Sequence, residues 1–289
     1  MNMGSIWQSL CEVAFEQRYL DVDGLRTRIA TAGPEDGVPV VMLHGTGGHW
    51  ETFSTTIGPF SETYRCVAVD MVGNGFTDKP DRPYEIAFYV DHVLGVMDAL
   101  GIKRAHLVGM SLGAWVAARI AVSWPERLRR LILMSPAGLI ATQSNMARIR
   151  AERTRAVNNP DWDSISAIFE HLIASDLRRL PDLIALRQII YRRDDTRATI
   201  DHLLALQDPE IRPRNLIAAD EWRNIHAPTL VVASGADHGE YQTTARQVAQ
   251  LIPHAEVLEM PKVRHWPHFE DPDTFNSAAR VFLGRDDAQ

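Results

Sequence analysis

The sequence predicts an α/β fold in which a mostly parallel, twisted sheet carries helices on both faces and contains an inserted helical lid. Short β-branched runs alternate with longer helical patterns, which is typical of a parallel sheet covered on both sides. Residues 138–222 interrupt this alternation with helical periodicity and almost no strand signal. The chain has 289 residues, 45% of them hydrophobic, which suffices for one large core.

Six short apolar runs are the expected strands of the core. They are Val38 to Leu43, Arg65 to Val69, Ala105 to Val108, Leu131 to Met134, Thr229 to Ala233 and Val257 to Met260. Ahead of them, Tyr19 to Ala30 predicts an antiparallel hairpin that turns at Asp23-Gly24.

Helical patterns separate these runs. Tyr84 to Leu100 has an apolar stripe and is followed by Gly101, a residue common at helix C-termini. Leu112 to Ser123 and Pro272 to Leu283 are further expected helices. Since strand-forming sequence resumes after residue 222, we expect a core of residues 1–137 and 223–289 with a lid at 138–222, not a second domain.

Composition excludes several classes of function. The formal charge of −7, with no basic block, argues against nucleic-acid binding. No run approaches the ~18 apolar residues that a spanning helix needs, and the acidic N-terminus does not resemble a signal peptide. Cys11 and Cys66 form no disulfide framework, and Cys66 is expected to be a small buried residue. These features predict a cytoplasmic protein without membrane contact.

The strongest chemical motif is Gly109-Met110-Ser111-Leu112-Gly113, which follows a predicted strand and opens a predicted helix. A G-x-S-x-G sequence in this context forms a sharp turn that exposes a nucleophilic serine. The flanking glycines allow the tight packing that the turn requires. A serine between glycines can also belong to a flexible loop, but the flanking strand and helix favour Ser111 as a nucleophile.

A serine nucleophile needs a base, and hydrolases with this turn supply acid and histidine after the serine, in that order. His265 lies just past the last predicted strand and is the favoured base. His268 is the alternative, although it is placed to enter the final helix. Asp237 follows the strand Thr229 to Ala233 and is the expected acid, the alternative being a helix-capping aspartate. We expect His44, which ends the first core strand, to fix the neighbouring loop, and Asp70 and Asp78 to brace a turn.

An oxyanion hole needs two N–H donors. One is expected from Leu112, directly after the nucleophile. The other is expected from Thr46, in the loop His44-Gly45-Thr46-Gly47-Gly48. A glycine-rich loop can also bind phosphate, but this one lacks the Lys-Ser/Thr that follows such loops. No metal-ligand spacing or cofactor motif occurs, so neither a metal nor a cofactor is expected.

With these motifs the chain resembles the α/β-hydrolase family, and within it the meta-cleavage-product hydrolases, which split a C–C bond in products of aromatic ring fission. His265-Trp266 and Phe275-Asn276 are similar to the subfamily's C-terminal signature. Ala185-Leu186-Arg187, with Arg192-Arg193-Asp194, is similar to a lid segment whose arginine binds the dienoate end of the substrate. The resemblance gives that role to Arg187, which could otherwise be a helix-surface residue.

Two departures from the subfamily pattern concern the pocket. The glycine loop is shorter than usual, and Met110 stands where the subfamily often has Asn, which indicates a more apolar pocket. Gly45, Met110 and Trp266 are expected to contact the substrate together with Arg187.

The resemblance implies hydrolysis of a vinylogous 1,5-diketone acid of the 2-hydroxy-6-oxo-dienoate type. A carboxylesterase for a small aromatic or alkyl ester remains the alternative, and a non-catalytic scaffold would predict a damaged triad. The only expected partner is a small-molecule substrate. A homodimer is compatible with the sequence, which does not fix the oligomeric state.

Overall fold

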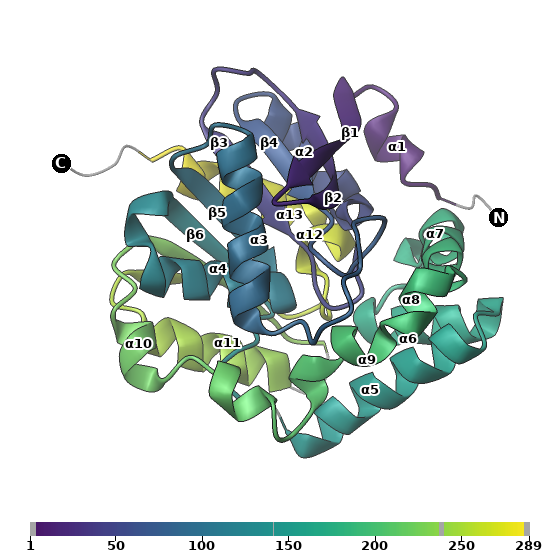
Figure 1. Ribbon diagram of the computed structural model, residues 1–289. Coiled ribbons are helices and arrows are strands. Elements are labelled where there is room, and N and C mark those ends of the chain that lie inside the picture. The colour runs from purple at the N-terminus through teal and green to yellow at the C-terminus, as the bar shows by residue number, and fades with distance from the viewer. Residues whose placement is uncertain (1–3, 141, 237–239, 286–289) are drawn as a thin grey trace.

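The computed structural model describes residues 4–140, 142–236 and 240–285, and its strands form one sheet in the order β1-β2-β4-β3-β5-β6-β7-β8 (Figure 1). The pairs β1–β2 and β2–β4 are antiparallel, and every later pair is parallel. The strands are β1 (Phe15–Val22), β2 (Leu25–Ala32), β3 (Pro39–Leu43), β4 (Arg65–Val69), β5 (Ala105–Met110), β6 (Leu128–Met134), β7 (Thr229–Ser234) and β8 (Ala255–Met260).

Burial of the central strands explains their sequences. Every residue of β5 and β7 is buried, as expected for parallel strands that are covered on both faces and read as continuous apolar runs. The edge strands differ, because β1 and β8 expose half or more of their residues, charged side chains among them. Charge on an edge strand opposes pairing with other chains.

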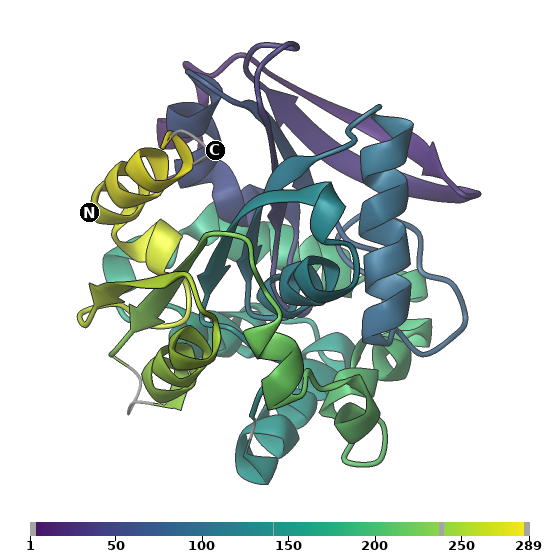
Figure 2. The same cartoon turned by 90° about the vertical axis from the view of Figure 1, so that its left-hand side faces the viewer.

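Two groups of helices cover the sheet (Figures 1 and 2). One face holds α3 (Ile86–Ala99), α4 (Leu112–Ser123), α10 (Ala219–Arg223) and α11 (Glu240–Leu251). The other holds α2 (Ser54–Ser61), α12 (Pro267–Glu270) and α13 (Pro272–Leu283), with α1 (Trp7–Leu10) packed on α2. The short 3-10 helices η1 (Trp50–Phe53) and η2 (Pro125–Arg127) precede α2 and β6.

Helices without strands occupy the described part of the chain between β6 and β7. Besides α10, they are α5 (Gln143–Asn158), α6 (Trp162–Leu172), η3 (Asp176–Arg178), α7 (Pro181–Tyr191), α8 (Asp194–Ala198), α9 (Ile200–Leu203), η4 (Ala205–Gln207) and η5 (Arg212–Asn215). The helices α5 to α9 gather at the lower right of Figure 1, to one side of the sheet. Thr142 and Asp161 cap α5 and α6 through their side-chain oxygens. The lid with bounds 138–222 stays a prediction.

The structure confirms the predicted α/β fold and its order of elements. The helices Leu112–Ser123 and Pro272–Leu283 have the predicted bounds. β6 begins three residues earlier than Leu131, at Leu128, because Arg129 and Arg130 lie within the strand and interrupt its apolar run. No helix in the described ranges is long and apolar enough to cross a membrane.

Candidate active site

Ser111 lies in a strained turn between β5 and α4, with φ 55° and ψ −110°. Such a conformation is costly for a residue with a side chain and persists only where the surroundings impose it. The flanking glycines permit it here, because they let neighbouring backbone approach closely. A Cβ on Gly109 would lie 2.4 Å from the Gly113 carbonyl oxygen, and one on Gly113 would lie 2.0 Å from that of Leu43. The turn therefore presents the Ser111 hydroxyl at the carboxyl end of β5.

His265 lies in the loop between β8 and α12 and lines the same cavity as Ser111. Its backbone is held on both sides: its N–H donates to Leu172 at 3.1 Å, and its carbonyl accepts from the Ser135 hydroxyl at 3.1 Å. The Tyr241 ring lies 4.2 Å from its ring, centroid to centroid. Burial, followed by the charges of Arg153 and Arg148, lowers the pKa of His265 to about 3. A neutral imidazole is the form that a general base requires.

The expected acid, Asp237, lies outside the described residues. β7 ends three positions before it, at Ser234, and β7 neighbours β8 in the sheet. Among the described residues, the Nδ1 atom of His265 has no hydrogen-bond partner although it is buried. This nitrogen is the one that an orienting carboxylate contacts in a Ser-His-Asp arrangement.

The loop after β3 faces Ser111 and offers free donors. Thr46 and Gly45 line the cavity beside Ser111. Among the hydrogen bonds of the described residues, the N–H groups of Thr46 and Leu112 donate none, whereas the Gly47 N–H donates to the Asn74 side chain at 2.9 Å. His44 fixes the loop as predicted: its Nδ1 donates to the Gly45 carbonyl at 2.7 Å, and its Nε2 accepts from the Met71 N–H at 3.1 Å.

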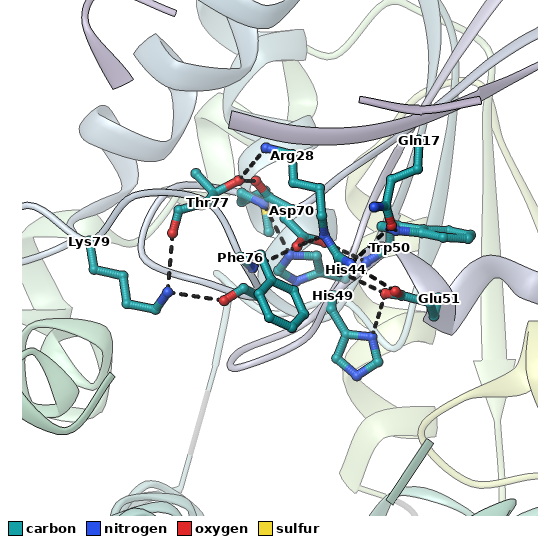
Figure 3. A network of polar contacts seen from close by, with 12 residues as sticks. Gln17, Arg28, His44, His49, Trp50, Glu51, Asp70, Phe76, Thr77 and Lys79 are labelled. Atoms are coloured by element: carbon teal, nitrogen blue, oxygen red, sulfur yellow. Dashed lines mark hydrogen bonds and ion pairs between the residues drawn. The ribbon is translucent and has the colours of Figure 1, made fainter. Parts of the chain in front are cut away.

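A buried ionic network supports the far end of this loop (Figure 3). Arg28 donates to Asp70 at 2.6 Å and to both oxygens of Glu51 at 2.9 and 2.8 Å. Asp70 also accepts from the Trp50 N–H at 2.7 Å, and Glu51 contacts His49 Nδ1 at 2.9 Å. Burial raises the pKa of Glu51 against the opposing effect of Arg28. Asp70 also accepts from the Phe76 N–H at 2.9 Å, so it links Trp50 to the turn at Phe76, the role expected of it from the sequence.

Two cavities meet at Ser111, with empty volumes of about 550 and 520 Å³ that include space open to solvent. The first has about equal polar and apolar surface and lies under α5, α6 and α7. Beyond the predicted residues, its polar lining residues are Arg148, Glu152, Arg153, His171 and Tyr241. The second is mostly apolar and is lined by residues that include Leu112, Trp115, Met146, Ile149 and Leu206. Ser111 and Thr46 belong to both.

Arg187, on α7, lines the first cavity and is only 1% exposed. Its guanidinium stacks over Phe169 and Tyr191, at 5.4 and 5.7 Å from the ring centroids. None of its three side-chain nitrogens makes a hydrogen bond of good geometry among the described residues, although the Tyr191 side chain stabilises its charge. Burial lowers the pKa of Arg187. A buried guanidinium without a counter-ion is unfavourable in an empty site and favours binding of an anion.

All four predicted substrate contacts, Gly45, Met110, Trp266 and Arg187, line the first cavity. His268, the alternative base, is not among its lining residues: its ring is buried elsewhere, with Nε2 against the Thr52 carbonyl at 3.0 Å. Sequence reasoning missed Arg148, Arg153 and Tyr241, and it missed Ser135, which holds the His265 carbonyl. No group of metal-ligating side chains occurs in the described ranges.

Comparisons with known proteins agree with this architecture. Residues 38–272 match the family model described as alpha/beta hydrolase fold. A 2-hydroxymuconate semialdehyde hydrolase from Pseudomonas putida is 30% identical over 272 residues, covering 92% of this chain and 93% of that protein.

Two solved structures are also similar. The 2-hydroxy-6-oxo-6-phenylhexa-2,4-dienoate hydrolase from Rhodococcus sp. strain RHA1 has a TM-score of 0.84 at 21% identity, over 94% of this chain and 100% of that one. At this identity, the likeness shows the fold. A meta-cleavage product hydrolase from Pseudomonas fluorescens IP01 has a TM-score of 0.77 at 25% identity, over 94% of this chain and 98% of that one. The chain belongs to the α/β-hydrolase fold family and, within it, resembles the meta-cleavage-product hydrolases.

Proposed function

We propose that the protein is a serine hydrolase that cleaves a C–C bond in vinylogous 1,5-diketone acids of the 2-hydroxy-6-oxo-dienoate type. The observation that carries this proposal is the position of Ser111 between a cavity with a buried guanidinium that has no carboxylate partner among the described residues and a mostly apolar cavity. Such a substrate has a carboxylate at one end and an acyl substituent at the other, with the reacting carbonyl near the substituent. The 2-hydroxymuconate semialdehyde hydrolase named above acts, by its name, on a substrate of this class.

In this proposal, Arg187 binds the carboxylate and the second cavity receives the acyl substituent. Gly45, Met110 and Trp266 enclose the chain between them. The dienol ketonises, which makes the remote part of the molecule able to accept the electron pair of the bond that breaks. Ser111 then attacks the distal carbonyl, while His265 takes its proton and Asp237 orients the imidazole.

The developing oxyanion is stabilised by the N–H groups of Thr46 and Leu112, which donate to no described group. Breaking the C–C bond releases the dienoate, to which a proton is added, and leaves the acyl group on Ser111. Water activated by His265 then hydrolyses this ester and releases an acid. Each residue in the scheme contributes binding, proton transfer or charge stabilisation, and no cofactor takes part.

The test of this function is whether the purified protein bleaches the yellow dienolate of a ring-fission product such as 2-hydroxy-6-oxo-6-phenylhexa-2,4-dienoate. We expect bleaching that is lost in Ser111→Ala. Rapid hydrolysis of simple esters without bleaching would refute the proposal.

Arg187→Met tests the carboxylate site. We expect kcat/KM for the dienoate to fall about 30- to 1000-fold, since losing one partner of a buried charge pair costs about 2–4 kcal/mol. Arg192→Met, an exposed arginine that follows the same helix, is the matched control. The melting temperature of Arg187→Met should be unchanged or higher, because the substitution removes a buried unpaired cation. A lower melting temperature with unchanged kcat/KM would show a structural role instead.

A carboxylesterase is the second candidate, and Met110 favours it. The Met110 sulfur approaches Gly45 beside Ser111 and offers no strong hydrogen bond to a polar substrate. If esters are the natural substrates, Arg187→Met should leave kcat/KM for uncharged esters unchanged and the dienoate should be a poor substrate of the parent protein. The predicted homodimer and cytoplasmic location stay predictions; the mass in solution by light scattering tests the first.

A further inference from the structure

A second guanidinium, that of Arg153 on α5, lies in the first cavity with Arg187. Arg153 is only 5% exposed, and its Nε has no hydrogen-bond partner among the described residues. No ion pair within the described ranges includes it. A buried arginine that only supports a fold normally has its donors satisfied by carbonyls or carboxylates. Arg153 therefore needs an explanation outside the fold.

Arg153 and Arg187 approach the same place from different helices. A Cβ built on Gly47, in the loop that faces Ser111, would lie 3.7 Å from Arg153 Nε and 2.7 Å from the Tyr191 hydroxyl. The Arg187 guanidinium stacks on the ring of that same Tyr191. Arg153 and Tyr191 thus meet beside Gly47, Arg187 stacks on Tyr191, and the charge of Arg153 helps to lower the pKa of Arg187.

The charges around them do not cancel. Among the described residues that line the cavity, Arg148 is paired with Glu152 at 3.0 Å, which leaves Arg153 and Arg187 without a carboxylate. Glu51, whose charge acts on Arg187, is engaged by Arg28 and His49. Two like charges in a buried site repel each other and are poorly solvated. A ligand with two negative charges at one end satisfies both.

We infer that Arg153 and Arg187 form a paired site for two acidic oxygens on adjacent carbons, the carboxylate and the ionised 2-hydroxyl of the dienol. This inference rests on the proposed function and specifies the form of substrate that binds. The Met110 side chain, in the same cavity, has no N–H or O–H donor, so the second oxygen requires a donor from another residue. On binding, the enol O–H loses its proton to solvent and no carbon–carbon bond changes. The protein selects the dianion over the singly charged enol.

The direct test uses Ser111→Ala, which prevents turnover, and the yellow dienolate of 2-hydroxy-6-oxo-6-phenylhexa-2,4-dienoate as the probe. Arg153→Met in this background should weaken binding about 10- to 100-fold, the range expected for one charge-assisted contact. It should also shift the absorption of the bound molecule toward that of the protonated enol. Arg155→Met, an exposed arginine on the same helix, should change neither. Equal affinity and spectrum for Arg153→Met and Arg155→Met would overturn the inference.

A second experiment tests the paired arginine site without depending on the C–C hydrolase proposal. Calorimetric titration of the parent protein should show that oxalate, with two charges on adjacent carbons, binds at least about 10-fold more tightly than acetate. Arg153→Met should abolish that preference, and Arg153→Lys should keep part of it because it retains the charge without the planar fork. If the preference holds but the parent protein does not bleach the dienolate, the proposed function fails and the paired site stands. If bleaching occurs without any preference for oxalate, the paired site fails alone.

Discussion

The buried network of Arg28, Glu51 and Asp70 gives the sharpest prediction about stability. Arg28 is 3% exposed and makes charged hydrogen bonds to both carboxylates. Arg28→Met keeps most of the apolar stem but leaves two buried carboxylates without their cation. Removing one partner of a buried ion pair costs about 3–5 kcal/mol. We therefore expect the free energy of unfolding to fall by about that amount at neutral pH.

The stability lost in Arg28→Met should depend on pH in a defined direction. Burial already raises the pKa of Glu51, and loss of Arg28 raises it further. An acid whose pKa is higher in the folded state binds more protons there than in the unfolded chain, so its penalty grows as pH rises. The difference between Arg28→Met and the parent protein should thus be largest near pH 8 and shrink toward pH 5. Adding Glu51→Gln to Arg28→Met should recover part of the loss.

Urea denaturation followed by tryptophan fluorescence measures these differences. With a slope of about 3 kcal/mol/M, the Arg28→Met midpoint should fall by about 1 M or more. Arg26→Met is the matched control, because Arg26 lies in the same strand with its side chain exposed, and surface substitutions usually change stability by less than about 0.5 kcal/mol. A loss for Arg28→Met that equals that of Arg26→Met would refute the role given to the network.

The remaining predictions concern the turn at Ser111, the base and the buried histidines. Gly113→Ala places a Cβ 2.0 Å from the Leu43 carbonyl oxygen, so we expect about 2–4 kcal/mol of destabilisation with loss of turnover; an unchanged melting temperature and rate would contradict the turn described. Because burial and then Arg153 and Arg148 lower the pKa of His265 to about 3, the acid limb of kcat/KM should lie well below pH 6.5, and Arg153→Met should move it to higher pH; a limb that does not move removes Arg153 from the surroundings of the base. Four buried histidines have lowered pKa values in the folded state: His44, His92, His265 and His268. As pH falls below about 6.5, the unfolded chain takes up protons first, so the free energy of unfolding decreases by up to about 1.4 kcal/mol per pH unit for each histidine. Urea midpoints measured between pH 8 and pH 5 test this, and midpoints that do not change with pH would contradict it.

Local patterns were sufficient to predict much of the fold and the position of the nucleophile. The turn at Ser111 has a local signature of five residues between a strand and a helix, so the sequence predicts it, although Leu43 and Met134 also contact it. The buried strands also follow from their apolar runs. The edges of elements were less predictable, since Arg129 and Arg130 lie inside β6 although charged residues usually end a buried strand.

Contacts between distant segments could not be predicted in this way. α5 carries four arginines at positions 148, 150, 153 and 155, and only the packing of α5 on α6 and its neighbours buries Arg153. The Arg28 network joins residues 42 and 23 positions apart, and each of them alone resembles an ordinary surface charge. Asp237, assigned from the order of motifs, lies outside the described residues, and its role stays a prediction.

The most direct test of the account is the reaction of the parent protein and of Ser111→Ala with the yellow 2-hydroxy-6-oxo-6-phenylhexa-2,4-dienoate, followed by absorbance and by product analysis. The account predicts rapid loss of colour with release of benzoate and a five-carbon dienoate by the parent protein, and bound, uncleaved dienolate in Ser111→Ala. Equal rates of cleavage by the two proteins would contradict the central claim that Ser111 is the nucleophile.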